Sequence, residues 1–212
     1  MSRDTTKPQK GYSQYLEGTR LATARAVGLD IHAKGCFEIA RELRPQGKGD
    51  NTTYTSVAQA ISRLEQVLLI EGWVPHPDAP GGFKRLNNPR LKGQAKAIPY
   101  RRGSGNKKRR KSGPGMVGHR RGGMGPGRYP VKAAKEFIKL LNSAAENARH
   151  RYDDIEPMDM FITHCAAHRG VIHRGWIPRA RGRATPHNHY QVNIELFLED
   201  FSGGEEDEED EF

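Results

Sequence analysis

Acidic residues are missing from a long stretch near the C-terminal end of the chain. Between Met160 and Ile194 there is no Asp or Glu, yet four arginines lie between Arg174 and Arg183. Solvated surface loops usually carry charges of both signs, so this imbalance argues against an ordinary exposed loop. Guanidinium groups pair with phosphate oxygens and stack on bases. The stretch therefore favours contact with folded RNA.

Cysteines and long hydrophobic runs are also scarce. Cys36 and Cys165 are the two cysteines, they lie far apart and form no CxxC motif, so we expect two reduced, buried thiols. No run approaches the roughly 20 apolar residues of a membrane span, and the N-terminus MSRDTTKPQKGY has no signal-peptide core. We expect a soluble, unsecreted chain that does not bind membranes.

Positive charge dominates the rest of the sequence. The 212 residues include 35 Lys and Arg against 25 Asp and Glu, a net charge of +10, and nine of the acids lie in the last fourteen positions. Without these nine acids the remaining body carries +19. Such an excess opposes a compact state unless a polyanion is nearby. The acidic tail, 199–212, is predicted to be disordered.

Three segments have the periodicity of core helices. Leu16, Leu21, Ala24 and Val27 lie near helical spacing, which predicts a first helix that ends at Gly28. The segment KGCFEIARELRP predicts a second helix that ends at Pro45. The segment VKAAKEFIKLLNSAAENARH, which follows Pro130, predicts the third and best-defined helix, over 130–150.

The segment 46–95 has a different composition. An apolar stripe from Val57 to Leu68 predicts one helix, closed by Gly72, and a Pro-rich arm follows it. One helix cannot bury its own stripe, so it must dock on the main core or on a neighbouring molecule.

The segment 100–128 is basic and rich in Gly and Pro. It contains ten Lys or Arg and no acid, so we expect a loop that phosphate contacts bring into order. Gly113, Gly115 and Gly118 fit a GxGxxG pattern, but no strand precedes them and Pro114 interrupts them, which argues against a dinucleotide site.

Two later segments switch to the period-two alternation of half-buried antiparallel strands. They are MDMFITHCAAHRG and HYQVNIELFLED. If they pair, the residues between them form a hairpin that projects roughly 30 Å beyond the core. An isolated ribbon is marginal in water, so its support must come from outside the protein.

Two other chemistries are weaker alternatives. His164, Cys165 and His168 could meet His187 and His189 to hold zinc, but neighbouring strand residues face opposite sides. Histidines that face RNA or have partners in the protein are favoured. Cys165 with His168, or Ser143 with a distant histidine, lacks any signature of a catalytic pocket, so no enzyme activity and no cofactor are expected.

The segments GRYPVKAAKEFIKLLNSAAENA, MFITHCAAHRG, PRARGRA and QVNIELFLED together resemble a ribosomal large-subunit family, universal L twenty-two, which is called L seventeen in eukaryotes. The long loop before GRYP resembles the archaeal and eukaryotic branch. The resemblance implies an α+β fold, with three helices packed on a small antiparallel sheet and a long protruding β-hairpin. This sequence departs from the family pattern in two places, the helical insert and the acidic tail.

The resemblance also implies site residues. Arg179, Arg181, Gly182 and Arg183 match the rRNA-contacting part of the returning hairpin arm, with Arg169 to Trp176 nearer the tip. Gly127 to Pro130 match the start of the third helix. The full set of expected rRNA-binding residues is Arg101, Arg102, Lys107, Lys108, Arg109, Arg110, Lys111, Arg120, Arg121, Arg128, Arg169, Arg174, Trp176, Arg179, Arg181, Gly182 and Arg183.

A domain organisation and a set of partners follow. We expect a flexible basic N-terminus (1–14), N-terminal core helices (15–45), a family-atypical insert (46–95), the rest of the core (96–198) and the tail (199–212). Expected partners are large-subunit rRNA, neighbouring ribosomal proteins and the nascent polypeptide at the exit tunnel, without homo-oligomers. The helix at Val57–Leu68 is expected to dock on a neighbouring ribosomal protein or RNA. A free nucleic-acid-binding regulator remains an alternative.

Overall fold

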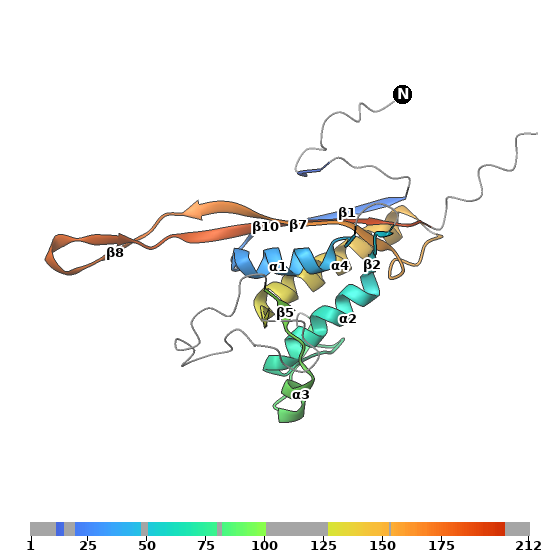
Figure 1. The fold of residues 1–212 in the computed structure, drawn as a ribbon, viewed down its shortest axis with the longest axis horizontal. Helices are drawn as coiled ribbons and strands as arrows, with labels where there is room; N and C mark the ends of the chain where they lie inside the picture. The colour runs from blue at the N-terminus through green and yellow to red at the C-terminus, as the bar shows by residue number, and fades with distance from the viewer. Residues whose placement is uncertain are drawn as a thin grey trace, which may run out of the picture.

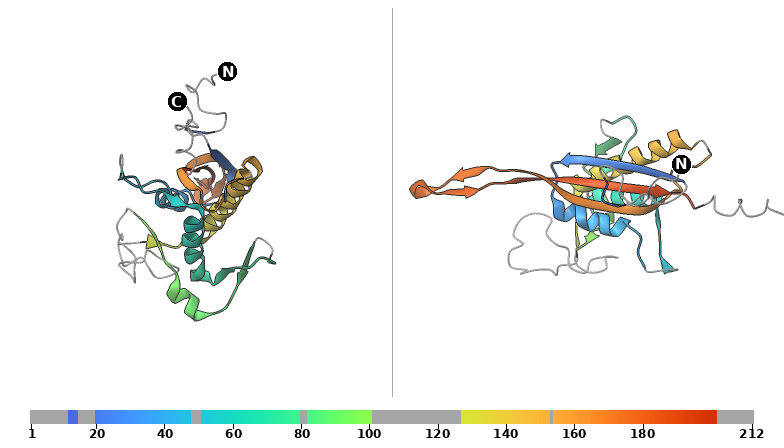
Figure 2. Two further views of the ribbon diagram at one scale, coloured as in Figure 1. Left: turned by 90° about the vertical axis from the view of Figure 1, so that its right-hand side faces the viewer. Right: turned by 90° about the horizontal axis from the view of Figure 1, so that it is seen from above.

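One antiparallel sheet with helices on one face forms the centre of the molecule. The structure, a computed structural model, describes residues 12–14, 20–47, 51–79, 82–100, 127–152 and 154–201. The sheet has the strand order β1-β10-β7-β2, with β1 at Leu21–Leu29, β10 at His189–Glu199, β7 at Phe161–His173 and β2 at Thr55–Ser56. The helices lie on one side of it, below the sheet in Figure 1, and Figure 2 gives two further views. The α+β class with an antiparallel sheet is confirmed.

The core forms where the sheet meets two of the expected helices. α1 (Ala33–Leu43) buries Cys36, Ile39, Ala40 and Leu43, and α4 (Val131–Arg151) buries a broad stripe centred on Phe137 and Leu141. Alternate residues of β10, from Val192 to Leu198, are almost fully buried against these helices. Both helices and both period-two strands are confirmed, because their apolar spacing matches the face that each element buries.

The expected first helix is wrong, because this segment forms strand β1. Ala22 and Ala24 are buried toward the helices, while Thr23 and Arg25 face the other side, so the segment has a period of two. β1 pairs with β10 from Leu21↔Glu199 onward, and the register shifts between Ala26 and Leu29, around Gly28 with its φ of 73°. Pairing with a distant strand has overridden a weak local helical pattern.

The helix α2 (Val57–Leu68) packs within this chain, so its expected docking on a neighbouring molecule is wrong. Its buried residues Val57, Ala60, Leu64, Val67 and Leu68 belong to the same core as α4. Ser56 begins the helix with a capping box, in which its hydroxyl accepts from the Gln59 backbone N–H and the Gln59 side chain accepts from the Ser56 N–H. α1 and α4 therefore cover the sheet, and α2 packs on α4.

Short elements replace the irregular arm that was expected after α2. A 3-10 turn, η2 (Leu69–Glu71), leads to Gly72 and to the pair β3 (Trp73–Pro75) and β4 (Phe83–Arg85). The helix α3 (Pro89–Gln94) and the pair β5 (Ile98–Pro99) and β6 (Gly127–Arg128) follow. The Lys135 ammonium lies 3.1 Å from the centre of the Trp73 ring, and this contact attaches the β3–β4 pair to α4.

Side chains of α4 and of Tyr152, which follows it, cover part of the outer edge of β1. The Asn147 amide donates to the Thr23 carbonyl and the Arg151 guanidinium donates to the Leu21 carbonyl, each at 2.9 Å. The Leu21 N–H donates to the Tyr152 hydroxyl at 2.9 Å. These three contacts satisfy backbone groups that a strand at the edge of a sheet would otherwise leave free.

Candidate nucleic-acid interface

The outer parts of β7 and β10 form a ribbon that extends beyond the helices. The two strands pair from Glu199↔Phe161 at the root to His189↔His173, and two shorter strands, β8 (Trp176–Pro178) and β9 (Ala184–Pro186), continue the ribbon. Figure 1 shows this ribbon reaching away from the rest of the molecule, with β8 near its end. Among the described residues, each outer arm has only the other as a neighbour, so most of its side chains are open to solvent.

The tip of the hairpin is the short turn η5 (Ala180–Gly182). Arg181 has φ 59° and ψ 39°, Gly182 has φ 66°, and the Arg179 N–H donates to the Arg183 carbonyl at 2.7 Å. Two successive left-handed residues reverse the chain tightly. The expected positions were therefore wrong. Arg179 to Arg183 form the tip, whereas Arg169 to Trp176 lie on the outgoing arm.

The hairpin carries exposed arginines together with exposed apolar side chains. Trp176 is 66% exposed, and Val171, Ile172, Ile177 and Tyr190 are also open to solvent. Within the described part of the chain, no carboxylate forms an ion pair with Arg169, Arg174, Arg179, Arg181 or Arg183. Arg179 donates to the Thr185 hydroxyl at 3.2 Å, across the neck of the tip. This arrangement presents cationic forks and stacking surfaces to an external partner.

Most of the expected basic loop lies outside the described residues. Arg101, Arg102, Lys107, Lys108, Arg109, Arg110, Lys111, Arg120 and Arg121 belong to it. Its far end returns to the core at β6, where the Arg128 guanidinium lies 5.3 Å from the centre of the Tyr100 ring. A Cβ at Gly127 would lie 2.7 Å from the Ile98 carbonyl oxygen, so this close pairing of β5 and β6 requires glycine.

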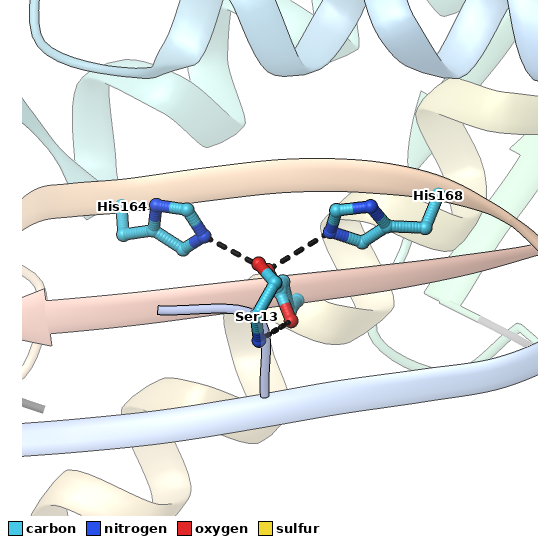
Figure 3. Close-up of polar contacts among 4 residues, drawn as sticks. Ser13, His164 and His168 are labelled. Atoms are coloured by element: carbon cyan, nitrogen blue, oxygen red, sulfur yellow. Dashed lines mark hydrogen bonds and ion pairs between the residues drawn. The ribbon is translucent and has the colours of Figure 1, made fainter. Parts of the chain in front are cut away.

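A buried carboxylate lies at the root of the hairpin, on the sheet face away from the helices. Glu195 is only 3% exposed, and its Oε1 is 3.0 Å from Nε2 of both His164 and His168. The Ser13 N–H donates to Glu195 Oε2 at 3.1 Å, and the Ser13 hydroxyl donates to Oε1 (Figure 3). Burial alone would raise the pKa of Glu195, but the bonds from Ser13, His164 and His168 lower it to about 2. The carboxylate is thus charged and fully engaged.

Sequence reasoning did not identify Glu195 as a functional residue. It is the first acid after the acid-free stretch, and β10 alternation assigns it to the face opposite Ile194 and Leu196. An acid at that position, next to a strand that carries two outer-face histidines, is the signal that could have found it. Its contact with Ser13, which is 182 residues away in sequence, left no local pattern.

The five groups considered for zinc do not converge. Cys165 is buried on the helix side, where burial raises the pKa of its thiol to about 12, whereas His164 bonds to Glu195 on the other side. His187 and His189 contact each other on the returning arm, and His189 pairs with His173, well beyond His168 along the ladder. His164 and His168 therefore have partners within the protein.

Comparison with known proteins identifies the family. The family model described as ribosomal protein L22p/L17e matches residues 82–199. A large ribosomal subunit protein uL22 from Methanocorpusculum labreanum is 33% identical over 187 residues, which cover 88% of this chain and 94% of the relative. Its counterpart from Methanoculleus marisnigri is 34% identical over 190 residues, which cover 89% of this chain and 95% of the relative.

A third relative matches a shorter segment more closely. The protein of the same name from Methanococcoides burtonii is 50% identical over 82 residues, which span 39% of this chain and 53% of that relative. The three relatives are archaeal, in agreement with the branch that the long loop before GRYP indicates. On the family match and the long alignments together, this chain belongs to the ribosomal protein L22p/L17e family, in its archaeal form.

Proposed function

We propose that this protein is a structural, non-enzymatic component of the large ribosomal subunit in the cytoplasm, and that it binds rRNA mainly through its hairpin. The names of the relatives support the assignment to the subunit. The observation that carries the rRNA proposal is the row of five arginines that no described carboxylate neutralises, on a ribbon that extends away from the other described elements. A polyanion that surrounds the ribbon would supply both the missing charge and the missing contacts.

In the proposed binding, charge supplies most of the affinity, and the shape of the ribbon and base stacking make a smaller contribution. Each arginine that pairs with a phosphate releases counterions, so affinity falls steeply with salt. Phosphate contacts fix position and carry little sequence information. Trp176 and Tyr190, which are exposed on opposite arms, have rings on which unpaired bases can stack. We expect the basic loop 100–128 to add further phosphate contacts.

The length of the ribbon suits it to bridging. From Arg169 to Arg179 the chain extends about 33 Å at roughly 3.3 Å per residue. An arm of this length would join rRNA segments that lie apart in the secondary structure, and would thereby support subunit assembly. We further propose that the tip, Arg179 to Arg183, lines the nascent-peptide exit tunnel, because among the described residues it lies farthest from the core (Figure 1).

The root supplies the stiffness that such an arm needs. The inner face of β7 and β10 is buried against α1 and α4, and on the outer face Glu195 joins β10 to His164 and His168 of β7. Both faces of the root are therefore fixed, so the direction of the arm is determined by the protein before any RNA binds. The tail and the domain boundaries remain predictions, and the tail beyond Phe201 lies outside the described residues.

The proposal is tested by sedimentation of native extract through a sucrose gradient in high salt, with the chain followed by mass spectrometry. We expect it to migrate with the large subunit, because an arm enclosed by folded RNA is released slowly even though high salt weakens each phosphate contact. A chain that stays at the top of the gradient, while other large-subunit proteins sediment, would leave the free nucleic-acid-binding regulator as the better account.

A further inference from the structure

Three aromatic rings meet at the end of the sheet opposite the hairpin. The Phe201 ring lies 5.0 Å from the Tyr54 ring and 5.6 Å from the Phe161 ring, measured between centroids. Tyr54 precedes β2, Phe161 begins β7 and Phe201 follows β10, so the three come from three parts of the sequence. We call these three residues the aromatic patch.

The aromatic patch is open to solvent, in contrast to the other aromatic contact on this sheet. Tyr54 is 38% exposed and Phe201 is 47% exposed, whereas Phe197, farther along β10, is 3% exposed. Phe197 is covered because the Tyr12 ring packs on it at 5.1 Å and the Tyr12 hydroxyl donates to Thr23. The chain thus covers Phe197, but it leaves Tyr54 and Phe201 exposed and the Phe161 ring half-buried beside them, as a binding surface requires.

Carboxylates flank the residues of the aromatic patch in the sequence. Asp154, Glu156 and Asp159 precede Phe161 in the sequence, Glu199 ends β10, and Asp200 follows it immediately before Phe201. Arg20 pairs with Asp154 at 3.2 Å and with Asp200 at 3.5 Å, which neutralises part of this charge. In the sequence, Phe201 is followed by seven acids between Glu205 and Glu211.

This charge identifies the kind of partner. Phosphates would be repelled here, so RNA is a poor occupant, although the same rings would stack on bases elsewhere. Lysine and arginine side chains would make two favourable interactions here. Their charge is attracted to the carboxylates, and their ammonium or guanidinium groups bind the faces of aromatic rings. Aromatic residues are also enriched in protein–protein interfaces.

We infer that the aromatic patch is a docking surface for an extended, Lys- and Arg-rich segment of a neighbouring large-subunit protein. This inference rests on the proposed function, because it requires the chain to lie inside the subunit. The molecule then has two ends with opposite preferences: the acid-free hairpin takes RNA, and the aromatic patch takes a basic protein segment. Each end would exclude the partner of the other by charge.

Photo-cross-linking in assembled subunits tests the inference. Benzoylphenylalanine is placed at Phe201 in one full-length variant and at Trp176 in a second, each is expressed in cells, and purified large subunits are irradiated. We expect the probe at position 201 to form cross-links to one large-subunit protein, within a segment of several Lys or Arg and no acid. We expect the probe at position 176 to form cross-links to rRNA.

A third variant isolates the role of charge. It keeps the probe at position 201 and adds Glu156→Gln and Asp159→Asn, which remove two carboxylates that no described ion pair uses. We expect the protein cross-link to fall about fivefold, as the loss of two partly screened attractions predicts. An unchanged yield would overturn the charge complementarity on which the inference depends.

The outcomes separate the two proposals. If the probe at position 201 labels rRNA, its own chain only, an acidic or uncharged protein segment, or nothing, while the probe at position 176 labels rRNA, the docking inference is wrong and the proposed function stands. If neither variant nor the unmodified chain enters large subunits, both are wrong.

Discussion

The root and the outer arms of the hairpin are built from the same two strands, yet different forces hold them. At the root, one face of β10 is sealed by α1 and α4, and the other holds Glu195 under Ser13, His164 and His168. In the outer arms, both faces are open and Trp176 and Ile177 are exposed. The comparison indicates that the root is stabilised by contacts within its own chain, whereas among the described residues the outer arms have only their pairing with each other.

Removing a buried side chain from the root should have the largest effect on the folding of the isolated protein. Leu196 is 1% exposed, so Leu196→Ala should lower the free energy of unfolding by about 2–5 kcal/mol. The matched variant Ile177→Ala, at 37% exposure on the outgoing arm, should change it by less than about 0.5 kcal/mol. Urea denaturation measures both. Equal losses would mean that the arms fold with the core, contrary to the comparison.

Removing charge from the tip should affect RNA binding and leave folding intact. The triple change Arg179→Ala, Arg181→Ala and Arg183→Ala should weaken incorporation into subunits and lower the slope of log affinity for rRNA against log salt by about 2–3. Binding is measured as a function of salt concentration. The control Arg90→Ala with Lys92→Ala, on α3, should leave the slope closer to that of the unmodified chain. Normal incorporation of the triple variant would contradict the proposed role of the tip.

Neutralising Glu195 should reduce stability more moderately and change its dependence on pH. The pKa of Glu195 is lowered from the ordinary 4.5 to about 2, so its stabilising contribution is present above about pH 4.5 and is lost as pH falls toward 2. Glu195→Gln should lower the free energy of unfolding near pH 6 by about 1–3 kcal/mol. The difference from the unmodified chain should shrink between pH 4.5 and 2. Urea midpoints across that range measure it, and a difference that stayed constant would show that the carboxylate charge is not responsible.

Relieving the backbone at the tip should have the smallest effect. Arg181 is the one non-glycine residue with positive φ among the described residues, at 59°. Arg181→Gly removes a cost of roughly 1 kcal/mol for the left-handed conformation but adds freedom to the unfolded chain. The net change in unfolding free energy should stay below about 1 kcal/mol. A large loss of stability by thermal denaturation would show that the Arg181 side chain makes contacts that keep the hairpin folded.

Elements whose own residues repeat with one clear period were predictable from the sequence. α1, α4, β7 and β10 follow from such spacing, and α2 was predicted as a helix. β1 was not, because Leu21, Ala24 and Val27 fit a helix while Ala22 and Ala24 fit a strand, and only pairing with β10 decides between them. The partner of the α2 stripe was missed for a similar reason, since its spacing does not reveal which surface covers it.

The candidate site likewise has parts that the sequence predicts and parts that it does not. The charge of the hairpin was apparent from composition, but the position of its tip depends on the two left-handed residues Arg181 and Gly182. An arginine in that conformation has no sequence signal. The contact between Ser13 and Glu195 joins residues far apart in the chain, and the aromatic patch combines three separate segments, so both required the folded structure.

The contacts of Asn147, Arg151 and Tyr152 with the edge of β1 bear on the life of the chain before assembly. A newly made protein with a bare strand edge can recruit the same strand of another copy, and such stacking grows into aggregates. Here α4 occupies the carbonyls of Leu21 and Thr23, and so removes two of the sites at which a second strand would attach. By this argument α4, which packs in the core, also opposes self-association of free copies of the protein through the edge of β1.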